Sequence, residues 1–149
     1  LSEGRGTTRP FEIFGAPFIE PYALAARLAR ERLPGVHFRP LYFQPRFQKW
    51  AGRLGGGLQL HITERRRFKP VRTAVTVLTT VKRLHPSKFR WRKPPYEYER
   101  VKPPIDILYG SDGLRRALAT GRPARNVAQS WESPLRKFAK VRKKYLHYP

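Results

Sequence analysis

The segment near the amino end constrains the fold most, because neither a helix nor a strand can hold most of it. Residues 2–17 contain three glycines, two prolines, two arginines and two carboxylates. Glycine adopts backbone angles that other residues avoid, and proline fixes the chain while it removes a hydrogen-bond donor. A loop of this composition presents side chains and backbone N–H groups to a ligand. An ordinary N-terminal turn is the alternative.

Hydrophobic spacing and proline positions divide the rest of the chain into helices and strands. Pro40 lies inside a strand over 36–43, so that strand is expected at a sheet edge. A second strand covers 58–63, after a flexible run of three glycines, and Phe89–Trp91 could form a third. The predicted helices cover 21–33, 70–84, a short stretch between Asp112 and Gly121, 123–131 and 134–145, with Asp112 and Ser133 as N-caps. A strand is the alternative for 70–84, which is rich in valine and threonine, and the last two helices are alternatively one helix kinked at Pro134.

These elements predict an α+β fold. We expect a small mixed sheet covered by about four helices in a single domain, residues 1–149. The length is enough for one core that buries roughly two-thirds of the unfolded surface. The four prolines of residues 93–104 predict an irregular segment there.

The charge is strongly unbalanced, with 32 basic residues against 10 acidic ones and a net charge of +22. Such a surface favours anionic partners. The basic residues are scattered in short groups, which is more typical of solvated faces than of one groove. No apolar run approaches the roughly 20 residues of a membrane span, and no signal peptide is recognisable.

The four histidines give no metal-ligand spacing, and the chain contains no cysteine, so we expect no metal and no cofactor. His61 shares the polar face of the strand over 58–63 with Gln59 and Thr63. It is either a structural histidine or the floor of a binding pocket. Trp91, Tyr96 and Tyr98 alternate with basic residues, an arrangement that stacks on sugars or on unpaired bases, or that anchors an irregular segment.

Seven short motifs, spread over essentially the whole chain, carry a family resemblance. They are Ser2–Glu12 with Gly15–Pro17, Leu33–Pro40 with Phe43 and Pro45, Gly57–Thr63, Phe68–Arg72, Pro95–Glu99, Pro104–Gly110 and Tyr145–Tyr148. In this order they resemble the C-terminal domain of the bacterial peptidoglycan exo-β-N-acetylmuramidases (the NamZ-like family). The resemblance implies a larger Rossmann-like N-terminal domain before Leu1, which carries the principal catalytic glutamate.

The resemblance also implies a role for the N-terminal segment in binding a terminal N-acetylmuramic acid of peptidoglycan or a muropeptide. Arg5 is the sharpest candidate, since a guanidinium grips a carboxylate through two hydrogen bonds and this sugar carries a lactyl carboxylate. Glu3 is expected in a supporting catalytic role. It could pair with Glu12, as glycosidase carboxylates do, only if the loop folds back. The expected substrate-binding residues are Arg5, Gly6, Thr7, Thr8, Arg9 and His61.

Two alternatives to a cell-wall hydrolase remain open. Charge and aromatic content fit a basic nucleic-acid-binding module, although no motif supports it. A truncated relative without activity is the other. For the preferred hypothesis the resemblance implies a secreted or periplasmic location, the N-terminal domain as a partner, and a fragment that is inactive alone.

Overall fold

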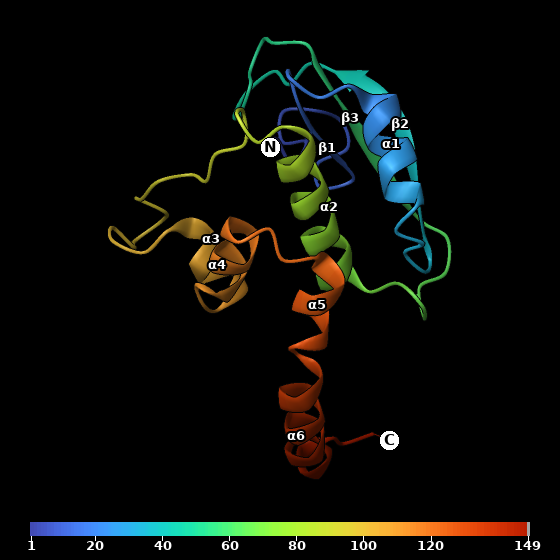
Figure 1. Cartoon of the computed structure of the whole chain (residues 1–149), viewed down its shortest axis with the longest axis vertical. Helices are drawn as coiled ribbons and strands as arrows, with labels where there is room; N and C mark the ends of the chain where they lie inside the picture. Colours follow the sequence, from blue (N-terminus) through green and yellow to red (C-terminus); the bar gives the residue numbers. More distant parts are fainter. Residues whose placement is uncertain (149) are drawn as a thin grey trace. The chain divides into compact units, whose positions relative to one another are not determined.

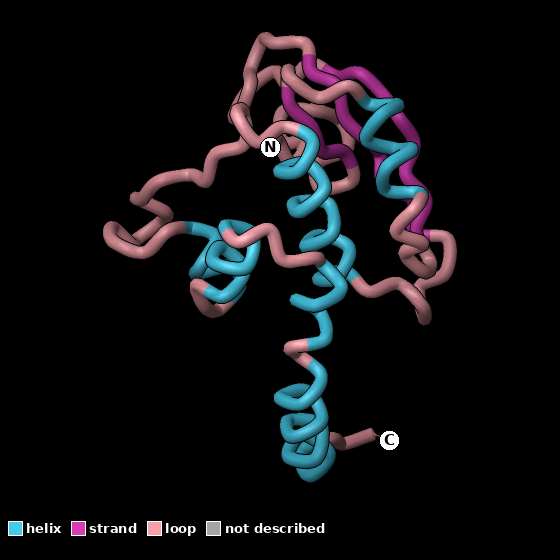
Figure 2. The backbone as a smooth tube through the Cα atoms, in the orientation of Figure 1, coloured by secondary structure: helices cyan, strands magenta, loops and turns pink. Residues whose placement is uncertain are grey.

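The computed structural model describes residues 1–148 and divides the chain into two compact units, Leu1–Arg90 and the part from Trp91 onward. The first unit holds all three strands, as Figure 2 shows, and two helices. Its elements are β1 (Ile13–Ala16), α1 (Pro21–Ala29), β2 (Val36–Phe43), β3 (Gly55–Ile62) and α2 (Pro70–Leu84). The second unit holds short helices. Together they confirm the predicted α+β class.

The sheet has the order β1-β3-β2, and every described pair of strands is antiparallel. Pro40 therefore lies in an edge strand, as predicted. Strand β1 was not predicted, because Ile13–Ala16 falls within the segment judged irregular. Its Gly15 lies opposite Gly57 of β3, and this pairing of two glycines lets the strands approach closely. The glycine run 55–57 is thus part of β3 and not a flexible entry to it.

Helices α1 and α2 pack together over one face of the sheet, where α1 lies along β2 and β3 (Figure 1). Leu24, Leu28, Leu58 and Val81 form the centre of this core and are almost completely buried. Each such side chain contributes roughly 1.5–3 kcal/mol of burial energy. The residue spacing predicted a face of α1 made of Tyr22, Ala25, Ala26, Ala29 and Leu33. That prediction is wrong, since Tyr22 is exposed and Leu24 and Leu28 face the core instead. The helix also ends at Ala29, four residues early.

Helix α2 has the predicted bounds, but the spacing predicted a buried face made of Val71, Ala74, Val75, Leu78 and Val81. Of these only Val75 and Val81 are buried, and Val71 and Ala74 are exposed. Threonines 73, 76, 79 and 80 are buried as well. Thr76 and Thr79 each donate a 2.8 Å hydrogen bond to the carbonyl oxygen four residues earlier. These bonds satisfy the hydroxyls and let polar side chains enter the interior.

The second unit contains four α-helices and a final 3₁₀ turn among the described residues. They are α3 (Pro104–Tyr109), α4 (Gly113–Ala119), α5 (Ala124–Gln129), α6 (Glu132–Arg142) and η1 (Lys143–Tyr145). Helix α3 was not predicted, and no strand forms over Phe89–Trp91. Helix α6 begins at Glu132 with Trp131 as its N-cap, so Ser133 is not the cap, and Pro134 fits within the first turn.

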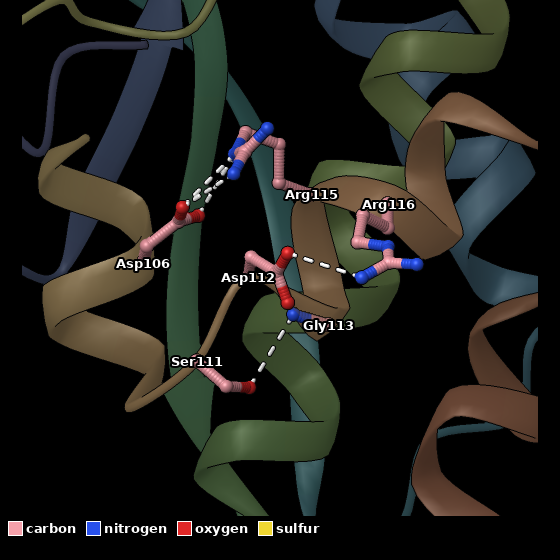
Figure 3. A network of polar contacts seen from close by, with 6 residues as sticks. All are labelled: Asp106, Ser111, Asp112, Gly113, Arg115 and Arg116. Carbon is pink, nitrogen blue, oxygen red and sulfur yellow. Dashed lines mark hydrogen bonds and ion pairs between the residues drawn. The ribbon is translucent and has the colours of Figure 1, made fainter. Parts of the chain in front are cut away.

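Ion pairs and one aromatic contact join the helices of the second unit. Arg115 of α4 donates two hydrogen bonds of 3.0 Å and one of 2.7 Å to the Asp106 carboxylate of α3 (Figure 3). Asp112 occupies the predicted N-cap position of α4, but its carboxylate pairs with Arg116 and Ser111 Oγ accepts the hydrogen bond from Gly113 N–H. Trp131 Nε1 donates to Tyr109 Oη at 2.6 Å.

Candidate functional site

The N-terminal loop (Ser2–Glu12) folds back on itself and is attached to the sheet at both ends. Ser2 and Gly15 exchange two backbone hydrogen bonds, of 2.7 and 3.1 Å. Phe11 N–H donates to the carbonyl oxygen of Glu3 at 2.7 Å, and Leu60 N–H donates to that of Glu12 at 2.8 Å. The loop is therefore an ordered platform on β1 and β3 and not a frayed terminus.

Gly6 shows why the loop needs glycine. Its φ is +83°, and a Cβ atom there would lie 2.5 Å from the Phe47 carbonyl oxygen. Arg46 N–H donates to the Gly6 carbonyl oxygen at 2.8 Å. The close approach that we expected toward a sugar is thus used, at Gly6, to dock the loop on the chain's own 46–47 segment.

Glu3 lies between two cations. Lys49 Nζ is 2.6 Å from one carboxylate oxygen, and Arg5 Nε is 3.4 Å from the other. Partial burial acts to raise the pKa of Glu3, but the Lys49 hydrogen bond and the charges of Lys49 and Arg5 outweigh it, so the pKa lies below its usual value. Glu3 is therefore ionised at neutral pH, which suits it to hold cations and not to donate a proton. No sequence pattern pointed to Lys49, which is 46 residues away from Glu3.

Arg5 is the loop cation whose terminal Nη groups have no hydrogen-bond or ion-pair partner among the described residues, whereas Arg9 uses Nη1 to pair with Glu12. Its side chain is 50% exposed, and its guanidinium carbon lies 5.5 Å from the centre of the Phe11 ring. Within residues 1–148 it makes the Glu3 ion pair through Nε and this ring contact, but no hydrogen bond. The Nη groups are therefore available for a carboxylate ligand.

A second polar network runs from the loop across the sheet. Arg9 Nη1 lies 3.2 Å from Glu12 Oε2, which also accepts a 3.3 Å hydrogen bond from Gln59 Nε2. Gln59 Oε1 in turn accepts from Arg39 Nη2 at 2.7 Å. Although the loop does fold back, Glu3 and Glu12 are thus bound by different cations.

The remaining predicted residues differ in their surroundings. Thr7 stabilises the turn, because its Oγ1 donates to the Gly4 carbonyl oxygen at 2.6 Å and accepts from Arg9 N–H. Thr8 is exposed. His61 is also exposed and lies opposite His37 in the β2–β3 register, a juxtaposition that sequence spacing did not reveal. Among the residues described, no group of three or more potential metal ligands occurs.

An open hollow in the second unit is a weaker candidate site. It is lined by Glu99, Lys102, Asp106, Ile107, Gly110, Ser111 and Asp112. Its carboxylates are already engaged, since Asp106 and Asp112 bind arginines (Figure 3) and Glu99 accepts from the backbone N–H groups of Val101 and Lys102. The carboxylates of this hollow are therefore all hydrogen-bonded or paired within the second unit.

Substituting Lys49 should change the titration of Glu3. We expect Lys49→Gln to raise the Glu3 pKa, because it removes the charge and the hydrogen bond that stabilise the carboxylate. In the unaltered protein, a folded pKa below the ordinary 4.5 means that ionised Glu3 contributes stability above that pH, which is lost as the pH falls through the folded value. Carbon-detected NMR titration of the Glu3 carboxyl measures the shift. Lys88→Gln, at an exposed position, is the matched control, and an unchanged Glu3 pKa in Lys49→Gln would contradict the ion pair.

Comparison with known proteins identifies the family. The sequence-family model for the C-terminal domain of the exo-β-N-acetylmuramidase NamZ matches residues 1–148 and so covers both units. The chain belongs to this family. The peptidoglycan β-N-acetylmuramidase NamZ of Bacillus subtilis is 40% identical over 148 residues, which are 99% of this chain and 34% of that protein. A DUF1343 family protein of Bacteroides fragilis, solved by crystallography, matches 99% of this chain and 38% of its own with a TM-score of 0.83 and 26% identity.

These findings confirm the resemblance seen in the sequence and limit what it covers. The chain spans about a third of the length of the relatives that it matches. The matched family and the B. subtilis relative are named for muramidases, so they lend no support to a nucleic-acid-binding module. None of the described helices is both long and apolar enough to cross a membrane.

Proposed function

We propose that this chain is the C-terminal part of a bacterial peptidoglycan exo-β-N-acetylmuramidase that releases terminal N-acetylmuramic acid from cell-wall fragments. The observation that carries the proposal is the NamZ family match over residues 1–148, with 40% identity to a peptidoglycan β-N-acetylmuramidase. The parent protein then contains an N-terminal domain that supplies the principal catalytic glutamate. A role in cell-wall recycling and a secreted or periplasmic location accord with such a substrate.

In this proposal the N-terminal loop completes the substrate pocket. Arg5 binds the lactyl carboxylate of N-acetylmuramic acid through its Nη groups, while Nε remains beside Glu3. Ionised Glu3 supports catalysis indirectly, because with Lys49 it fixes the position of the Arg5 guanidinium. Thr7, Thr8 and Arg9 would contact the same sugar from the loop, and His61 from the exposed end of β3, while buried Gly6 holds the loop on segment 46–47.

The test compares this chain alone with a protein in which the N-terminal part of its relatives precedes it. We expect the chain alone to show no turnover of a chromogenic N-acetylmuramide, because the proposed acid–base groups lie outside it, and the two-part protein to be active. Turnover by the chain alone would overturn the assignment of catalysis to the N-terminal part.

A binding measurement separates the nucleic-acid alternative from the proposal. Polyanions should bind this +22 chain through its charge, and the binding should weaken steeply as the salt concentration rises. Binding of a specific oligonucleotide that persists at high salt, together with no effect of muropeptides, would favour the nucleic-acid module.

A further inference from the structure

Helix α6 presents two opposite faces to solvent and buries neither. No residue of α6 is buried, and in Figure 1 the helix extends beyond α5. Leu135, Phe138, Val141 and Tyr145 recur at intervals of three and four residues and are 59%, 62%, 53% and 75% exposed. Residues at this spacing share one side of a helix. The helices of the second unit therefore leave an apolar stripe uncovered, which we call the α6 stripe.

The cations of this region are divided between the two sides. Arg136 and Lys140 lie opposite the α6 stripe, whereas Lys137 and Lys144 flank it and Arg142, four residues after Phe138, lies on its side. A partner that covers the stripe can leave Arg136 and Lys140 in water. Their desolvation, which is costly for unpaired ions, is avoided.

The helix cannot rely on its own backbone for stability. It has 11 residues, and isolated helices shorter than about 12–15 residues are marginal in water. Stable helices of this length depend on packing of an apolar face. A stripe of large apolar side chains rimmed by polar residues is the usual sign of an interaction surface.

The comparisons indicate a candidate partner for the stripe, namely the rest of the parent protein. The family match continues to residue 148, so α6 and its stripe belong to the domain that the relatives share. This domain is 34% of the B. subtilis relative and 38% of the solved one, so in both proteins about two-thirds of the chain lies outside it. That remainder is covalently linked to the stripe, and its effective concentration exceeds that of any separate partner.

We infer that the α6 stripe is the docking surface for the N-terminal domain of the parent protein. The inference rests on the proposed function in one respect, the presence of that domain. Phe138 lies at the middle of the stripe and is the expected anchor, since large aromatic side chains near the centre of an interface contribute most to binding. The side of α6 that carries Arg136 and Lys140 remains in solvent.

Hydrogen exchange of the α6 amides tests the inference on the two-part protein, with this chain alone as the reference. We expect exchange at least about tenfold slower in the two-part protein, because docking adds to the free energy of local opening. Phe138→Ser should return the α6 amides to the rates of the chain alone. Lys140→Ser, on the side opposite the stripe, should leave the protection intact, and circular dichroism of each variant in the chain alone checks the fold.

The outcomes separate this inference from the proposed function. Protected α6 amides without turnover of the N-acetylmuramide would support docking and refute the activity. Turnover with unprotected α6 amides would support the activity and refute docking at the stripe. Equal protection in Phe138→Ser and the unaltered protein would overturn the stripe as the surface.

A basic amphipathic helix can also bind membranes, so both proteins are sedimented with phosphatidylglycerol vesicles. Phe138-dependent sedimentation of the two-part protein would assign the stripe to a lipid surface and overturn the inference.

Discussion

Gly57→Ala should destabilise the first unit by about 3 kcal/mol, the upper part of the range for an overpacked interior. A Cβ atom at position 57 would overlap the Phe14 carbonyl oxygen and lie 2.9 Å from Gly15 Cα. Both neighbours are backbone atoms of β1, so no side-chain rotation relieves the clash and the strand itself must move. Because Ser2 is bonded to Gly15, the displacement also reaches the loop that carries Glu3 and Arg5. Urea denaturation measures the loss as a lower midpoint.

Gly55→Ala is the matched control in the same strand. A Cβ atom there would lie 3.2 Å from the Ala16 carbonyl carbon, a tight contact that a shift of a few tenths of an ångström relieves. We expect a clearly smaller loss of stability than for Gly57→Ala. Equal stability of the two variants would contradict the close approach of β1 to β3.

Arg5→Lys should reduce kcat/KM of the two-part protein for an N-acetylmuramide by about 10- to 100-fold. Lysine keeps the charge beside Glu3 but lacks the planar fork that binds a carboxylate through two hydrogen bonds. A hydrogen bond to a charged group contributes about 1.5–3 kcal/mol, and each 1.4 kcal/mol corresponds to a factor of ten. Steady-state kinetics on the chromogenic substrate measures the change.

An N-acetylglucosaminide analogue provides the internal control for Arg5, because it lacks the lactyl carboxylate. Its kcat/KM should change little in Arg5→Lys, whereas a damaged loop would depress both substrates. Arg67→Lys, at an exposed arginine paired with Glu64, controls for the substitution itself. Equal losses on both substrates, or none on either, would remove Arg5 from the binding site.

The site could be predicted in part. The N-terminal loop, its glycines and Arg5 stand out in the sequence because they are close together and unusual in composition. Lys49 and the Arg39–Gln59–Glu12 network could not be found in this way, since their members come from segments 20 to 47 residues apart. Only the pairing of β1 and β2 with β3 brings those segments together. Whether Gly6, Thr8, Arg9 and His61 contact a sugar stays a prediction.

The sequence by itself determined the features that depend on local chemistry. Proline and hydrophobic spacing specified the bounds of α2, and Pro40 specified the edge position of β2, because each effect acts within a few residues. The tertiary structure decided the rest. Ile13–Ala16 is a strand only because β3 pairs with it, and the inward face of α1 follows from the sheet it covers. The burial of Thr76 and Thr79 also comes from tertiary packing, although the carbonyl oxygens that satisfy their hydroxyls lie in the same helix. These outcomes depend on contacts between distant segments, which local propensity does not encode.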